Sequence, residues 1–138
     1  MTTDKTRPFV VGLIRSYPCE SVVGFVLRRH YNPSMDKLAA LNEILQLDPA
    51  NAFARYGLAM EHISRGNPDL ALSEFAICIG HNPDYVPAYQ MSAQTLVTLG
   101  RTEAALEQLN AGIHAAQRTG NQHALAEMSA MRDELATR

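Results

Sequence analysis

Histidine and cysteine are the residues of this chain best suited to metal binding or acid–base chemistry. The histidines are His30, His62, His81, His114 and His123. No two of them are four residues apart, and none lies near a CxxC or HExxH spacing. A catalytic histidine also needs a base or nucleophile beside it, and none is evident. We therefore expect no metal site and no catalytic residue.

The two cysteines, Cys19 and Cys78, lie in unlike settings. Cys19 is near the start of the chain, and Cys78 occupies a small-residue position of a predicted helix. We expect no disulfide between them. We interpret Cys78 as a small buried hydrophobic residue in a reducing compartment, in preference to a reactive thiol.

The glycines do not form a phosphate-binding loop. No glycine-rich run follows a predicted strand, and the sequence has no convincing strand. Gly57, Gly66, Gly100 and Gly120 are explained as close contacts or helix ends. We expect no cofactor and no enzymatic activity.

Charge is distributed unevenly along the chain. Residues 1–34 hold five basic and two acidic side chains, which is +3, and residues 35–138 hold seven basic and twelve acidic ones, which is −5. These add up to the net charge of −2. The change predicts a boundary near Pro33-Ser34, with an N-terminal extension or degenerate half-repeat in 1–34 and a repeat domain in 35–138. Without clustered Lys and Arg in that domain, nucleic acid is excluded as its partner.

The elements that position these residues are most clearly defined between Ala52 and Pro83. Apolar and small residues recur at helical spacing in two runs, which are Phe53, Tyr56, Gly57, Met60 and Ile63, then Leu70, Ala71, Leu72, Phe75 and Ile79. Gly66-Asn67-Pro68 separates the runs, with Gly66 ending one helix, Asn67 capping the next and Pro68 in its first turn. The pattern predicts a tight helix hairpin.

The hairpin pattern recurs at a fixed period, with about 34 residues from one unit to the next. A shift by one period aligns Leu38, Leu72 and Leu106, then Leu41, Phe75 and Leu109, then Leu45, Ile79 and Ile113. Ser34, Asn51, Asp84 and Thr102 are the expected helix caps, and the first repeated helix is expected over 35–47. A last helix after Gly120-Asn121 places Met128 and Leu135 on an apolar stripe that covers the preceding unit.

A known 34-residue repeat consensus, W-x2-L-G-x2-Y…A-x3-F…P, can be aligned with both units. In the first unit its positions are Arg55, Leu58, Ala59, His62, Ala71, Phe75 and Pro83. In the second unit it falls on Tyr89, Ser92, Ala93, Leu96, Ala105, Leu109 and Gln117. The chain therefore resembles the tetratricopeptide repeat family. Arg55, Ser92 and Gln117 depart from the pattern, and without a proline at Gln117 we expect a longer last helix pair. The resemblance implies an all-α fold of antiparallel helix-hairpin repeats stacked in a short right-handed solenoid, with His62 packed between helices and hydrogen-bonded through a ring nitrogen.

Residues 1–34 admit three interpretations. In the first, Ser21–Tyr31 forms the helix of a degenerate half-repeat. In the second, translation begins at Met35 and the preceding residues are a non-native extension. In the third, the segment is a weak basic element that binds a membrane surface. A signal peptide is rejected because Arg15 ends the short apolar run that starts at Phe9. No apolar run reaches the ~18 residues of a membrane span, so we expect a soluble protein. Since we interpret Cys78 as a reduced, buried residue, we expect the protein to be cytoplasmic.

The resemblance implies a protein-interaction scaffold that binds a peptide or protein segment in a concave groove. Carried over residue by residue, the groove-lining positions are Phe53, Tyr56, Met60, Ser64, Gln90, Gln94 and Thr98. Capture of a terminal carboxylate by Lys and Asn is not expected, because Lys5 and Lys37 are the only lysines. The alternative is a structural or regulatory subunit that self-associates or docks through an end helix. The sequence leaves the partner and the oligomeric state open.

Overall fold

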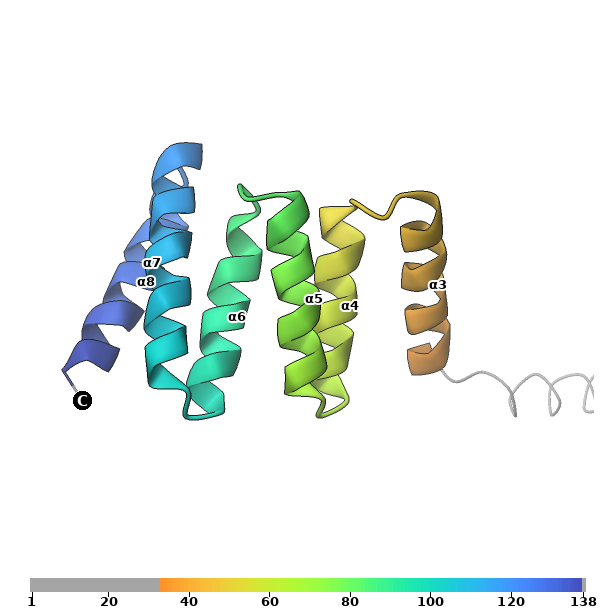
Figure 1. The fold of residues 1–138 in the computed structure, drawn as a ribbon, viewed down its shortest axis with the longest axis horizontal. Helices are drawn as coiled ribbons and strands as arrows, with labels where there is room; N and C mark the ends of the chain where they lie inside the picture. Colours follow the sequence, from red (N-terminus) through yellow and green to blue (C-terminus); the bar gives the residue numbers. More distant parts are fainter. Residues whose placement is uncertain (1–32, 138) are drawn as a thin grey trace, which may run out of the picture. The chain divides into compact units, whose positions relative to one another are not determined.

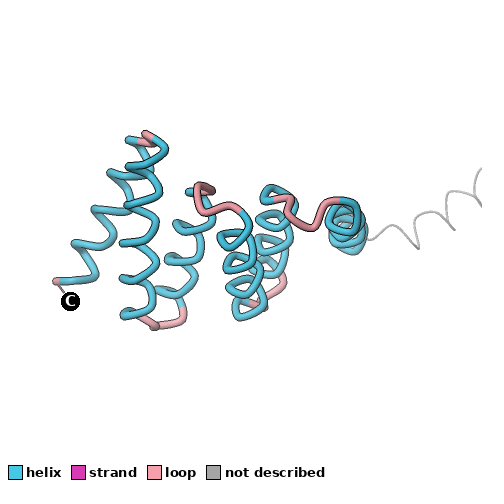
Figure 2. The backbone as a smooth tube through the Cα atoms, turned by 45° about the horizontal axis from the view of Figure 1, so that its top comes forward, coloured by secondary structure: helices cyan, strands magenta, loops and turns pink. Residues whose placement is uncertain are grey.

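In the computed structural model, residues 33–137 are described, and they form helices joined by short loops (Figures 1 and 2). The helices are α3 (Pro33–Leu47), α4 (Ala52–Ser64), α5 (Pro68–His81), α6 (Val86–Thr98), α7 (Thr102–Thr119) and α8 (Gln122–Ala136). The predicted all-α fold of antiparallel helix hairpins is confirmed over this range. Residues 37–138 form a compact unit of their own. Cys19 and the predicted helix in Ser21–Tyr31 lie outside the described residues.

The turns within the two hairpins, α4 with α5 and α6 with α7, have the same geometry. Gly66 and Gly100 take the left-handed conformation, with φ of 75° and 72°. The amide after each glycine closes the helix end, because Asn67 N donates to His62 O at 2.9 Å and Arg101 N donates to Leu96 O at 2.9 Å. A residue with a Cβ would be strained at either glycine. The predicted helix-ending role of Gly66 is therefore confirmed.

Asparagine side chains cap α4 and α8. The Asn51 side chain accepts a hydrogen bond from Ala54 N at 2.9 Å, and that of Asn121 accepts one from Ala124 N at 3.1 Å. Each bond satisfies a backbone amide that has no partner within the helix. The predicted cap at Asn51 is confirmed, as is the start of the last helix after Asn121.

Other expected caps are wrong. Asn67 does occupy the position before α5, as predicted, but its side chain makes no capping bond, and Thr102 is the first residue of α7 rather than its cap. Asp84 lies before α6, which begins at Val86 with a proline in its first turn, and its carboxylate pairs with Arg118 instead. Ser34 lies inside α3, which begins at Pro33. A proline in the first turn suits a helix start without a side-chain cap, because it has no amide proton to satisfy.

The last hairpin is longer than the first, as the missing proline at Gln117 predicts. Helix α7 has 18 residues, whereas α5 has 14. Gly120 ends α7 with a φ of 71°. Helix α8 then packs back on α7 and α6 and buries Met128 completely. Its predicted role as the helix that covers the second unit is confirmed.

The repeat positions of Leu41, Phe75 and Leu109 are buried as predicted, whereas those of Leu38, Leu72 and Leu106 are only half-buried. Phe75 and Leu109, which occupy equivalent positions in successive repeats, are both 0% exposed. The small residues Ala59, Ala71, Ala93 and Ala105 are also 0% exposed. Short side chains at these positions allow the helix backbones of one hairpin to approach closely. The repeat register therefore corresponds to the packing of the core.

Arg55 and Tyr89 occupy the family's tryptophan position and have equivalent contacts. Arg55 Nη2 donates to Pro49 O at 3.3 Å, and the Tyr89 hydroxyl donates to Pro83 O at 3.1 Å. The two prolines are themselves one repeat period apart. Arg55 also forms an ion pair with Glu74 of α5 at 2.9 Å, with both side chains less than a fifth exposed. The departure from the pattern at Arg55 thus replaces aromatic packing with a partly buried ion pair.

Helix α3 packs against α4 through leucine side chains. Leu41 and Leu45 form a small core cluster with Ala54 and Leu58 of α4. A Cβ added at Gly57 would lie 3.1 Å from Leu41 Cδ2, so this leucine fills the space that the glycine leaves. Ile44 and Leu47 of the same helix are exposed.

Candidate functional site

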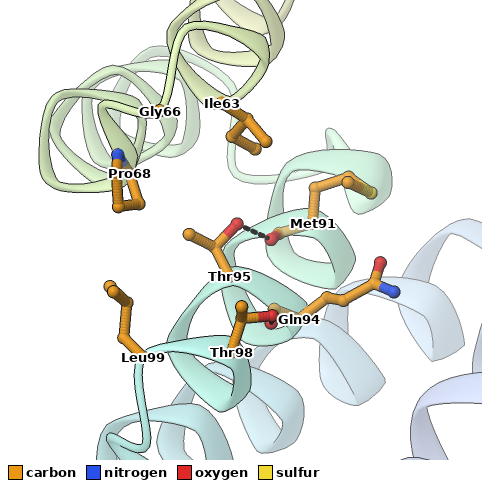
Figure 3. A pocket seen from close by; sticks show the side chains of 8 residues that line it. All are labelled: Ile63, Gly66, Pro68, Met91, Gln94, Thr95, Thr98 and Leu99. Carbon is orange, nitrogen blue, oxygen red and sulfur yellow. Dashed lines mark hydrogen bonds between the residues drawn. The ribbon is translucent and has the colours of Figure 1, made fainter.

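A hollow of about 520 Å³ lies between the α4–α5 turn and α6. Figure 3 shows its two walls facing one another. We call it the α4–α6 hollow, and its lining residues are Ile63, Gly66, Pro68, Met91, Gln94, Thr95, Thr98 and Leu99. The lining is mainly apolar and carries no charged side chain, so it suits an apolar side chain of a bound segment.

The polar groups of this hollow differ in their hydrogen bonding. Thr95 Oγ1 donates to Met91 O at 2.7 Å, and Thr98 Oγ1 donates to Gln94 O at 3.0 Å, as shown for Thr95 by the dashed line in Figure 3. Both hydroxyl protons are therefore used within α6. Among the described residues, none hydrogen-bonds the exposed side-chain amide of Gln94. That amide has a donor and an acceptor for a peptide backbone.

A second, smaller hollow of about 260 Å³ lies between α6 and α8. We call it the α6–α8 hollow, and it is lined by Gln94, Val97, Thr98, Met131, Glu134 and Leu135. Gln94 and Thr98 line both hollows. The α6 face that carries these two residues therefore lies between a mainly apolar hollow and a smaller one of mixed polarity.

The predicted groove residues of α6 lie together on one face. Gln94 and Thr98 line the two hollows, whereas Gln90 lies one turn before Gln94. Gln90 Nε2 donates to Glu127 Oε2 of α8 at 2.8 Å. The Gln90 amide is thus engaged within the protein, and it joins the first helix of the second unit to the last helix.

The predicted groove residues Tyr56 and Met60 of α4 pack against the core. The Tyr56 ring lies 5.8 Å from that of Phe75 and 5.6 Å from that of Tyr85, measured between centroids. Met60 packs against the same cluster. Burial raises the pKa of the Tyr56 hydroxyl. Neither residue lines a hollow, so substituting Tyr56 would test stability as much as binding.

Phe53 and Ser64 lie at the two ends of α4. Phe53 is 73% exposed in the first turn, which is unusual for a phenylalanine. Ser64 is the last residue of the helix, and its hydroxyl donates to Glu61 O at 2.8 Å. The structure thus separates the predicted α4 residues and does not gather them at one hollow.

Several lining residues were missed in the sequence, among them Ile63, Met91 and Leu99. Ile63 was assigned only to the apolar stripe of its helix. The repeat contains a signal for its second role: Ile63 and Val97 are one repeat period apart, and each lines a hollow against the next first helix. Pro68, assigned to the turn, also lines the α4–α6 hollow.

Glu61 of α4 is a buried carboxylate, with 5% of the residue exposed. The hydrogen bond from Arg65 Nε, at 3.0 Å, lowers the pKa of the Glu61 carboxyl, and burial acts in the opposite direction. Lys37 of α3, with Nζ 3.2 Å from Glu61 Oε2, lowers this pKa further. Glu61 is therefore held ionised and links α3 to α4.

Cys78 and His62, two of the residues considered above for metal binding or catalysis, are buried and half-buried, respectively. Cys78 is a free thiol, 0% exposed, that donates to Ala52 O at 3.4 Å, and burial raises its pKa. The predicted hydrogen bond of a His62 ring nitrogen is wrong, because Nδ1 is buried without a partner and no described residue hydrogen-bonds this side chain. Within residues 33–137, no three His, Cys, Asp or Glu side chains are grouped to hold a metal ion. No helix in this range is long and apolar enough to cross a membrane.

Comparison with known proteins gives a family match and several similar structures. The family model described as Tetratricopeptide repeat matches residues 62–128. A tetratricopeptide repeat domain protein from Salinibacter ruber, solved by NMR, is 33% identical, with 64% of this chain and 89% of that chain covered and a TM-score of 0.60. No curated protein matches the sequence.

Two more distant structures were solved as complexes. The TPR2B domain of yeast Sti1, in a complex with pHsp70, is 19% identical, with 72% of this chain and 80% of that chain covered and a TM-score of 0.67. PcrH, in complex with the chaperone binding region of PopD, is 16% identical, with 100% of this chain and 98% of that chain covered and a TM-score of 0.70. At these identities the likeness concerns the fold.

Proposed function

Because this chain belongs to the tetratricopeptide repeat family, we propose that it is a non-enzymatic interaction module that binds a peptide or protein segment along α4, α6 and α8. The observation that carries this proposal is the pair of hollows that both include Gln94 and Thr98 in their lining, the larger of them mainly apolar. The complexes of Sti1 with pHsp70 and of PcrH with PopD support it by analogy.

The contacts expected for such a segment follow from the lining. An apolar side chain enters the α4–α6 hollow, where it removes the exposed parts of Ile63, Met91 and Leu99 from water. The Gln94 amide, which no described residue hydrogen-bonds, pairs with the backbone of the segment. A hollow of about 520 Å³ has the size of a small-ligand site, so one or two side chains fill it.

The alternative, docking or self-association through the end helix, finds no support in the apolar residues of α8. Met128 is 0% exposed and Leu135 is 8% exposed, because both pack into the core of the second unit. Replacing them would destabilise the fold rather than test an interface. We therefore favour the face of α6 as the binding surface.

A matched pair of glutamine substitutions tests the proposal. Gln94 and Gln117 are both exposed, but only Gln94 lines the hollows. A photoreactive phenylalanine analogue at position 94 should cross-link a specific partner in the native cell, and one at position 117 should not. With the purified partner, Gln94→Trp should weaken binding at least tenfold, a loss of about 1.4 kcal/mol or more, while Gln117→Trp leaves it unchanged. Equal behaviour of the two positions would place the binding surface elsewhere.

A further inference from the structure

The basic side chains of residues 37–137 are all engaged in ion pairs. Each Lys or Arg in this range has a carboxylate oxygen within 2.6 to 3.2 Å, and the pairs are Lys37–Glu61, Arg55–Glu74, Arg65–Glu61, Arg101–Asp69, Arg118–Asp84 and Arg132–Asp133. An acidic partner segment would have to displace one of these carboxylates. Within residues 37–137, no Lys or Arg is therefore left without a carboxylate partner for an anionic ligand to bind.

Carboxylates, in contrast, are in excess. Residues 35–138 carry a net charge of −5. Glu43, Glu103 and Glu107 are exposed and have no Lys or Arg partner in the described part of the chain. The field around this unit is thus negative, which attracts cationic segments and repels anionic ones.

One of the carboxylates lies where α8 faces the proposed groove. Glu127 accepts the hydrogen bond from Gln90 of α6, and its side chain is 46% exposed. His123 Nε2 lies 3.3 Å from Glu127 Oε1, but no Lys or Arg pairs with Glu127 in residues 37–137. Glu134, seven residues further along α8 and on the same face, lines the α6–α8 hollow beside Met131. Negative charge and apolar surface therefore adjoin on the α8 side.

We infer that the segment bound in this groove is apolar and basic, with apolar side chains in the two hollows and a Lys or Arg beside Glu127. This inference rests on the proposed function, and it names the chemical class of the partner. Burial in the hollows supplies most of the affinity, because exposed ion pairs contribute little on their own. The carboxylate of Glu127 supplies discrimination, because an acidic residue at the same place would be repelled.

The inference is tested by selecting random dodecapeptides displayed on phage against the purified full chain. The selected peptides should be enriched in Lys and Arg over Asp and Glu, alongside aliphatic or aromatic residues. The strongest of them, made synthetically with a fluorescent label, should bind more weakly as NaCl rises, because screening reduces attraction between exposed charges.

A second matched pair of variants locates the charge effect. Glu127→Gln keeps an acceptor for Gln90 but removes the negative charge, and should weaken the labelled peptide about two- to fivefold. Glu107→Gln removes one charge from α7 at an exposed position that lines neither hollow, and should change affinity less than Glu127→Gln does. Unfolding curves of both variants should match that of the parent protein.

The outcomes separate this inference from the proposed function. If peptides are selected and Gln94→Trp weakens them, but they are neutral or acidic or Glu127→Gln has no effect, the groove binds a segment of another class and the inference is wrong. If no peptide is selected, or those selected bind Gln94→Trp as tightly as the parent protein, the groove itself is refuted. Equal losses of peptide affinity for Glu127→Gln and Glu107→Gln would show that only the net charge of the protein matters. That result would also overturn the inference.

Discussion

Replacing Gly112 with alanine is the most informative test of how α6, α7 and α8 pack. Gly112 lies inside α7 and is buried. A Cβ built at this position would lie 2.7 Å from Tyr89 Cβ of α6 and 2.7 Å from Met128 Sδ of α8. Ordinary carbon contacts are ~3.5–4.0 Å, so both neighbours would have to move. The Tyr89 atom is next to the backbone and cannot turn away, so α6 itself must shift.

The size of the effect follows from two opposing contributions. Alanine is favoured over glycine within a helix by about 1 kcal/mol. Overpacking a well-filled core costs about 1–3 kcal/mol. We expect overpacking to win, with a net loss of up to about 2 kcal/mol, because one clash is with a Cβ rather than with the end of a flexible side chain.

Gly80 provides the matched control. It is also within a helix, α5, but a Cβ at this position would meet no atom within 4 Å. Gly80→Ala should therefore stabilise the protein by up to about 1 kcal/mol through helix propensity alone. Urea unfolding followed by circular dichroism gives both free energies in the same experiment. The two variants should thus differ by the cost of overpacking, about 1–3 kcal/mol, although the substitution is identical.

Equal effects at the two glycines would refute the packing argument. If Gly112→Ala were as stabilising as Gly80→Ala, α6 and α8 could not lie as close to α7 as the contacts of Gly112 require. A large loss at Gly80 would show instead that its surroundings are covered in solution. Either result would contradict the arrangement of helices described above.

Three further predictions concern the core, a carboxylate and the N-terminal boundary. Phe75→Ala should lower the free energy of unfolding by about 3–5 kcal/mol, because the ring is completely buried; a loss under about 1 kcal/mol in urea melts would contradict the repeat register. Since the pKa of Glu61 is lowered, its ion pairs should stabilise the protein above the ordinary carboxyl pKa of about 4.3 and lose this effect as the pH falls through the lower folded value. In Glu61→Gln that part of the acid-induced loss should be absent, and an unchanged pH profile of thermal unfolding would count against it. A chain that begins at Met35 should unfold cooperatively, and calorimetry showing a broad or aggregating transition would mean that residues 1–34 are needed for folding.

Much of the fold could be predicted because its signals are local. The turn glycines Gly66 and Gly100 need a left-handed backbone whatever surrounds them, and the repeat spacing of Phe75 and Leu109 identifies core positions directly. The caps were harder to predict. Asp84 is a suitable capping residue by type, yet its carboxylate pairs with Arg118, which lies at the far end of the second unit in sequence. No local pattern distinguishes a capping aspartate from one that pairs with a distant arginine.

The sequence by itself determined which segments are helical, where the hairpins turn and which face of each helix is apolar, because helical periodicity and turn chemistry act within a few residues. Only the tertiary structure decided how the apolar surface is divided between core and groove. Tyr56 and Gln94 were both predicted to line the groove, but Tyr56 packs on Phe75 and Tyr85 while Gln94 lies between two hollows. The division depends on the spacing between helices of successive hairpins. Within α6 to α8, the helix spacing also depends on contacts between residues distant in sequence, such as those of Gly112 with Tyr89 and Met128.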